Sequence, residues 1–117
     1  EKHKKKINND IINYYFTPGN IYNLIKFAEE NDYDLENMDL NFFLNTIIDN
    51  KDFNKDKRIR ILIYDLVEFY FTKLNIANSN NIYEKYSYFI QKIIDTKKFN
   101  LDEESLLIEF KDKILNG

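Results

Sequence analysis

Hydrophobic residues recur along the chain at the three- and four-residue spacing of an amphipathic helix, and this pattern predicts six helical segments. No segment alternates apolar and polar residues over six or more positions, as a half-buried strand would. The predicted helices cover residues 4–16, 18–30, 40–49, 55–74, 82–98 and 101–115. We therefore expect an all-α fold, a compact bundle of five or six helices with a long apolar central helix at about 55–74.

Short polar residues stand where most of these helices are expected to begin. Thr17 precedes Pro18, a combination that suits an N-cap followed by the first helical position. Asp39 is expected to cap the helix over residues 40–49, and Asn100 the helix over residues 101–115. Asn81 lies three residues before a glutamate, which is a variant of the capping box.

Two helices supply most of the predicted core. On the helix over residues 82–98 one side is apolar and the other polar, so we expect its tyrosines to lie at the boundary with their hydroxyl groups in water; these are Tyr83, Tyr86 and Tyr88. We expect deep burial for five residues of this helix and the central one: Ile63, Leu66, Tyr70, Ile90 and Ile93.

The central helix carries large apolar residues on its charged side as well, namely Ile61, Tyr64 and Phe71. A helix with one buried face would not need them there. Either the helix is the hub of the bundle, with neighbours on most sides, or these residues form an exposed patch that binds a partner. We expect Ile61 to be buried. Tyr64 and Phe71 are the candidate partner-binding residues, because the charges of Arg60 and Glu68 flank them.

The composition suits one folded domain over residues 1–117. Ten Phe and nine Tyr among 117 residues provide enough apolar surface for a core, while the abundance of Asn, Lys and Ile is typical of an AT-rich genome. Because the first residue is Glu1, we expect a fragment or a processed chain, with a frayed basic end at residues 1–6. The lack of cysteine favours the cytoplasm, although an exported or surface fragment remains open.

Residue types that carry common chemistry are scarce. There is no Cys, His3 is the single histidine, and two glycines cannot form a phosphate-binding loop. Residues 32–36 and 52–56 have the acidic spacing that starts a calcium loop, but both lack its glycine and its twelfth-position glutamate. We therefore expect no enzyme, no cofactor and no metal. A small acid–base enzyme is the third-ranked alternative, since carboxylates are plentiful.

The charge distribution limits the choice of partner. The net charge is −3, the isoelectric point is about 5.2, and residues 29–39 hold six acidic residues and no basic one. A nucleic-acid-binding domain usually has a basic face, so we expect no nucleic-acid binding by this segment alone. No apolar run is long enough for a membrane span.

Residues 66–72 and 86–94 resemble the third and fourth helices of enterocin-type bacteriocin immunity proteins, which are small four-helix bundles that protect a producing cell. The resemblance is local and assigns no family. We expect a non-catalytic helical protein-interaction module of the immunity, adaptor or pathogen–host interaction type. The alternative is a regulatory or effector-binding domain of a transcription factor whose DNA-binding part lies outside this segment.

Overall fold

The computed structural model describes Ile11, residues 18–76 and residues 82–116. All regular structure in this part of the chain is helical, as predicted. It consists of α2 (Pro18–Glu30), α3 (Leu40–Asp49), α4 (Asp52–Lys55), α5 (Lys57–Ile76), α6 (Ile82–Phe99), α7 (Glu103–Phe110) and a π-helical turn, η1 (Lys111–Leu115). The helix predicted over residues 4–16 lies outside the described residues except for Ile11, which is buried. The caps predicted at Thr17 and Asn81 lie outside them too.

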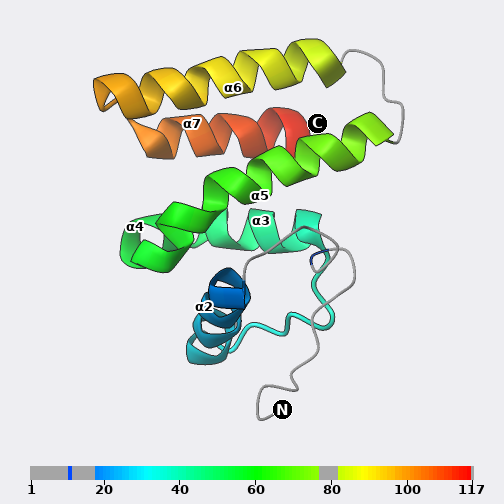
Figure 1. Ribbon diagram of the computed structural model, residues 1–117, viewed down its shortest axis with the longest axis vertical. Coiled ribbons are helices and arrows are strands. Elements are labelled where there is room, and N and C mark those ends of the chain that lie inside the picture. The colour runs from blue at the N-terminus through cyan, green and yellow to red at the C-terminus, as the bar shows by residue number, and fades with distance from the viewer. Residues whose placement is uncertain (1–10, 12–17, 77–81, 117) are drawn as a thin grey trace.

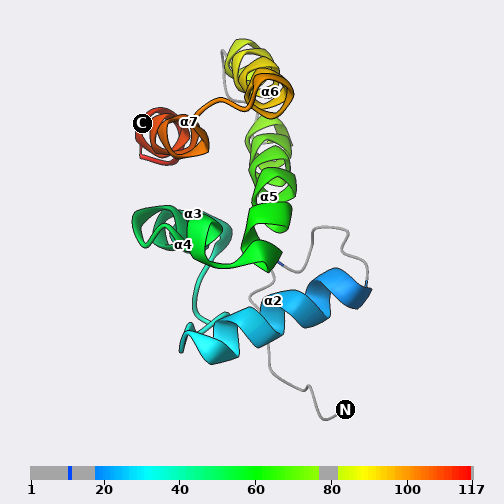
Figure 2. The same cartoon turned by 90° about the vertical axis from the view of Figure 1, so that its left-hand side faces the viewer.

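Helix α5 connects the two ends of the molecule, because it packs against α2, α3, α4 and α6. Helices α3, α6 and α7 are seen lengthwise in Figure 1 and end-on in Figure 2, whereas α2 is seen end-on in Figure 1 and lengthwise in Figure 2. Helix α2 therefore crosses the direction of the others. Helix α6 packs against α5 and α7 and lies at one edge of the molecule in both views.

The helix ends agree with the sequence at some points and not at others. The Asp39 carboxylate accepts a hydrogen bond from the backbone N–H of Phe42, which confirms the predicted cap of α3. The cap of α7 is Asp102 and not Asn100, because Asn100 takes a left-handed conformation (φ 53°) in the turn after α6. Asp102 accepts from the backbone N–H of Glu104 at 3.0 Å.

The predicted central helix begins two residues later than expected, after the separate short helix α4. Lys51 has a left-handed backbone (φ 56°) and Asp56 an extended one, so both ends of α4 are bent away from the helical path. The Asp56 carboxylate then accepts from the backbone N–H of Arg58 at 2.9 Å, which satisfies one free donor in the first turn of α5.

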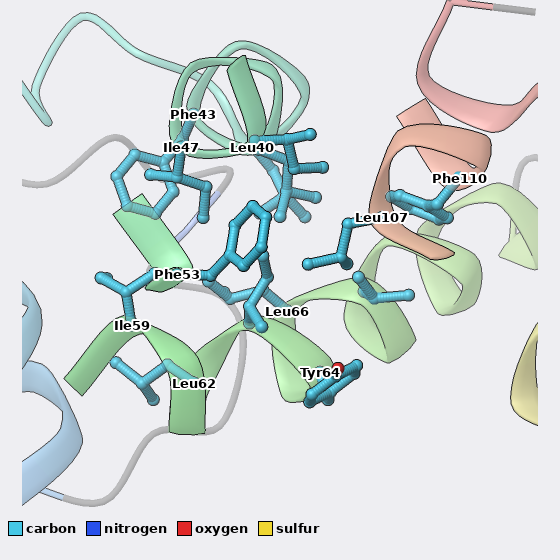
Figure 3. Packing of buried hydrophobic residues seen from close by; sticks show 14 of the residues in the cluster. Leu40, Phe43, Ile47, Phe53, Ile59, Leu62, Tyr64, Leu66, Leu107 and Phe110 are labelled. Carbon is cyan, nitrogen blue, oxygen red and sulfur yellow. The ribbon is translucent and has the colours of Figure 1, made fainter. Parts of the chain in front are cut away.

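One hydrophobic core contains residues of every described helix. Figure 3 shows part of it, with labelled residues from α3, α4, α5 and α7. Of the five residues expected to be deepest, Ile63, Leu66 and Ile93 are buried, as predicted. Tyr70 and Ile90 are only partly buried, which corrects the prediction for both. The Tyr70 hydroxyl instead accepts a hydrogen bond from Asn41 at 2.9 Å, so its ring lies at the core edge with a polar partner.

Asp52, from the second acidic run, points into the protein and not into a calcium loop. Its carboxylate is buried and accepts a hydrogen bond from the Tyr33 hydroxyl at 2.6 Å, and Asn50 in turn donates to that hydroxyl at 2.8 Å. In the first acidic run the Asp34 carboxylate accepts from Asn37 at 2.6 Å within its own turn. Among the described residues no group of three or more His, Cys, Asp or Glu is placed to hold a metal ion.

The middle of α6 is joined to α7 by a charged cluster around Glu109. Its carboxylate accepts hydrogen bonds from the Tyr88 hydroxyl at 2.7 Å, from Lys113 at 3.2 Å and from Lys92 at 3.3 Å. These donors, Tyr88 foremost, hold the pKa of Glu109 below its ordinary value.

This depressed pKa predicts a loss of stability in acid. A carboxyl whose pKa is lower in the folded state stabilises the fold above its unfolded pKa of about 4.3, and this contribution disappears as the pH falls through the folded value. We therefore expect the melting temperature followed by circular dichroism to fall below about pH 4.3 more steeply in the wild type than in Glu109→Gln. Parallel curves for the two proteins would contradict the role given to Glu109.

Candidate functional site

The two candidate residues on the central helix lie inside the protein. The Tyr64 side chain is 6% exposed and the Phe71 side chain 2% exposed. The Phe71 ring packs edge-on against Tyr86 and Phe110, with centroid distances of 5.5 and 5.6 Å, and lies 6.1 Å from Phe89. Helices α6 and α7 therefore enclose this ring almost completely, and it does not project from the surface toward a partner.

Tyr64 is enclosed by its surroundings but lacks a hydrogen bond. Its hydroxyl is buried without a hydrogen-bond partner, and the Lys97 ammonium lies 4.7 Å from the centre of its ring (Figure 3 shows the ring at the edge of the core). Burial first, and then the nearby Glu103 carboxylate, raise the pKa of Tyr64. The group is thus kept neutral, and its ring forms a contact between α5 and α6.

The isolated hydroxyl predicts an unusual response to mutation. Removing a buried polar group that has no partner removes its desolvation cost, so Tyr64→Phe should raise the free energy of unfolding by about 1 kcal/mol. Chemical denaturation followed by circular dichroism measures the change. A loss of more than about 1 kcal/mol would instead show that the hydroxyl has a stabilising partner.

Ile61 is the residue that the structure exposes, contrary to expectation: 63% of its side chain is accessible. At about 100° per residue, Ile61 lies about 60° from Tyr64 and about 80° from Phe71 around α5. Helix α6 covers the side of α5 that carries the two aromatic rings and leaves the side of Ile61 uncovered. The three residues therefore do not form one patch.

Besides Ile61 on α5, exposed apolar side chains lie on the neighbouring helix α6. Lys97 contacts Tyr64 and Tyr86 contacts Phe71, so α6 runs back along α5 in the opposite direction. On the flank of α6 beside α5, exposed apolar side chains recur at helical spacing, with the partly buried Ile90 between them. We call this surface the α5–α6 face and define its exposed apolar residues as Ile61, Tyr83, Tyr86 and Ile94.

A cavity of about 180 Å³ opens at one end of the α5–α6 face. It is lined by residues of both helices: Phe71, Thr72, Ile82, Tyr83 and Tyr86. Tyr83 forms one wall and is 75% exposed. The buried Phe71 is therefore the floor of this cavity and supports it without projecting from the surface.

The polar border of the α5–α6 face is acidic. Asp65 and Glu68 lie on the exposed side of α5 between Ile61 and Thr72. Neither carboxylate takes part in an ion pair in the part of the chain that the structure describes. A cation near this border is Lys97 of α6, whose ammonium group lies over the Tyr64 ring toward the start of α5.

The opposite flank of α6 differs, because its polar groups already bind one another. The Tyr88 hydroxyl donates to Glu109, and the ammonium groups of Lys92 and Lys113 lie 5.5 and 6.0 Å from the centre of the Tyr88 ring. Exposed aromatic rings therefore occur on both flanks of α6, and a cavity opens on each. The cavity beside Tyr88, about 550 Å³, is lined by Glu84, Lys85, Tyr88, Phe89, Lys113 and Ile114. The α5–α6 flank differs in that its exposed rings and its two α5 carboxylates are not joined to one another by ion pairs or hydrogen bonds among the described residues.

Sequence reasoning missed the residues of this face. The sequence places Tyr83 and Tyr86 at the boundary of the core and Ile94 on the apolar side of the helix over residues 82–98. Tyr83 and Ile94 lie about 100° and 120° around α6 from the buried Ile82, which takes them out of the core. Tyr86 lies about 40° from Ile82, so its ring packs against Phe71 while 37% of the residue stays exposed. A narrower assignment of the buried arc, centred on Ile82, Phe89 and Ile93, would have found them.

Comparisons of the chain with protein-family models, with curated proteins and with solved structures each found no match. The local resemblance to bacteriocin immunity proteins therefore stays a prediction. None of the described helices is long and apolar enough to cross a bilayer.

Proposed function

We propose that this protein is a non-catalytic protein-interaction domain that binds its partner through the α5–α6 face. The observation that supports the proposal is the row of three exposed apolar side chains on α6, which ends at a cavity, with Ile61 exposed on the neighbouring α5. Scattered apolar residues are normal on a protein surface, whereas apolar residues that gather beside a cavity and have a polar border are typical of a binding site.

The chemistry of the face favours a protein over a nucleic acid. Tyrosine is enriched in protein interfaces, since a rigid ring gives a large contact area and its hydroxyl tolerates water. Asp65 and Glu68 would repel the phosphate backbone of DNA or RNA, which basic side chains normally neutralise. A protein with apolar side chains is the partner that these groups suit best.

Alanine substitution on the face tests the proposal. We expect Tyr83→Ala and Ile94→Ala to reduce capture of a specific partner protein from the cells that encode this chain by about 10-fold or more, because buried aromatic and aliphatic anchors are commonly worth about 2 kcal/mol. Both residues are exposed, so the free energy of unfolding should change by less than about 0.5 kcal/mol.

Phe42→Ala is the matched control. Phe42 is also an exposed aromatic residue, but it lies on α3, away from the α5–α6 face. Its replacement should leave capture unchanged. Equal capture by all three variants, or equal loss in all three, would overturn the proposed function.

A further inference from the structure

We propose that the partner presents an amphipathic helix whose apolar side lies along the α5–α6 face and whose basic side chains meet Asp65 and Glu68. This inference rests on the proposed function and specifies the chemistry of the partner. It follows from the shape of the face, from its charge and from the way its two helices are paired.

The exposed apolar residues of α6 form a row along one flank, as the binding of a helix requires. Tyr83 and Ile94 are eleven residues apart on α6, a distance of about 16 Å along the helix axis or three turns. The neighbouring α5 runs in the opposite direction and adds Ile61, with the Lys97 ammonium over the Tyr64 ring between the two helices. A helix with apolar residues at positions i, i+3 or i+4 and i+7 presents a matching row, and the cavity beside Tyr83 accepts one of these side chains.

The charge of the two borders sets the chemistry of the partner. On the α5 border Asp65 and Glu68 are exposed and form no ion pair with any described residue. On the α6 border Ser87 and Gln91 lie in a shallow groove that also contains the Glu84 and Asp95 carboxylates. Both borders carry carboxylates, so a partner helix gains from lysine or arginine beside its apolar side, including the side that faces α5.

A second copy of this chain suits the face less well. Asp65 and Glu68 lie near the middle of the α5 border, between Ile61 and Thr72. A two-fold interface centred on the face would bring these carboxylates close to their own copies, and like charges placed together across an interface are unfavourable. The unpaired acidic border thus favours a different, basic chain.

A displayed library of random peptides about 16 residues long, enough for about 24 Å of helix, tests the inference on the full chain. We expect the enriched peptides to carry apolar residues at i, i+3 or i+4 and i+7 with lysine or arginine beside them. Their affinity should fall about fivefold or more in Glu68→Lys at low salt. Asp112→Lys is the charge-reversal control, since Asp112 is exposed on η1, which packs against α3 and α7, and it should change affinity less than twofold.

The outcomes separate the two proposals. Enriched peptides that are acidic or lack helical spacing, or whose affinity is insensitive to Glu68→Lys, overturn the inference; if Tyr83→Ala still weakens them, the proposed function stands. Peptides insensitive to both changes, or the absence of any enriched peptide, overturn both. Self-association of the purified protein that Tyr83→Ala abolishes would identify a second copy as the occupant and would also overturn the inference.

Discussion

Replacing Phe71 by alanine is expected to lower the free energy of unfolding by about 3 to 5 kcal/mol, the usual range for a large aromatic residue truncated in a core. The ring is 2% exposed and contacts three other aromatic rings, on α6 and α7. Because the space it leaves is enclosed by these rings, the surrounding helices can close it only in part. Denaturant unfolding followed by circular dichroism at 222 nm measures the loss.

Ile61→Ala is the control on the same helix. It removes an apolar side chain that is exposed, so the free energy of unfolding should change by less than about 0.5 kcal/mol. If Phe71→Ala costs less than about 1 kcal/mol, Phe71 is not a core residue, and the exposed-patch interpretation of the central helix regains its support.

Leu66→Ala should destabilise the protein by about 2 to 5 kcal/mol. Leu66 has no exposed surface and points from α5 into the core, on the side where α3 and α4 pack (Figure 3). The cost combines the lost burial of the side chain with the cavity left behind. Leu66→Met conserves the volume and should cost less than about 1.5 kcal/mol. If both variants lose the same free energy of unfolding, the stability at position 66 depends on something other than side-chain volume.

Apolar spacing was enough to predict the helical class and most helix limits. The ends of α3 and the start of α6 match the predicted limits, because apolar residues at positions such as Phe43 and Ile47 recur at helical spacing between polar residues. The short helix α4 was missed. Its four residues form little more than one helical turn, which is too short to show a repeating apolar spacing. The bends at Lys51 and Asp56 depend on backbone conformations that the apolar pattern does not reveal.

The candidate site could not be predicted, because the sequence does not say which neighbour covers which side of a helix. The sequence pattern predicts a buried Ile61 and leaves Tyr64 and Phe71 available to a partner, whereas Ile61 is exposed and the other two, about 60° to 80° away around the helix, are buried. Helix α6 makes the difference by packing beside α5. Likewise, Tyr83 and Ile94 belong to an apolar arc wider than the part of α6 that its neighbours cover.

The central claim is that a partner protein binds at the α5–α6 face. Site-specific photo-crosslinking in the cells that encode the chain tests it most directly, with the photoreactive residue placed at position 83, at position 94 or, as the control, at position 42. If the partner binds at the α5–α6 face, positions 83 and 94 each crosslink to one and the same discrete protein. Position 42 gives no such product, since Phe42 lies on α3 and outside the face. Crosslinking from position 42 to the same protein, or no discrete product from either face position, would contradict it.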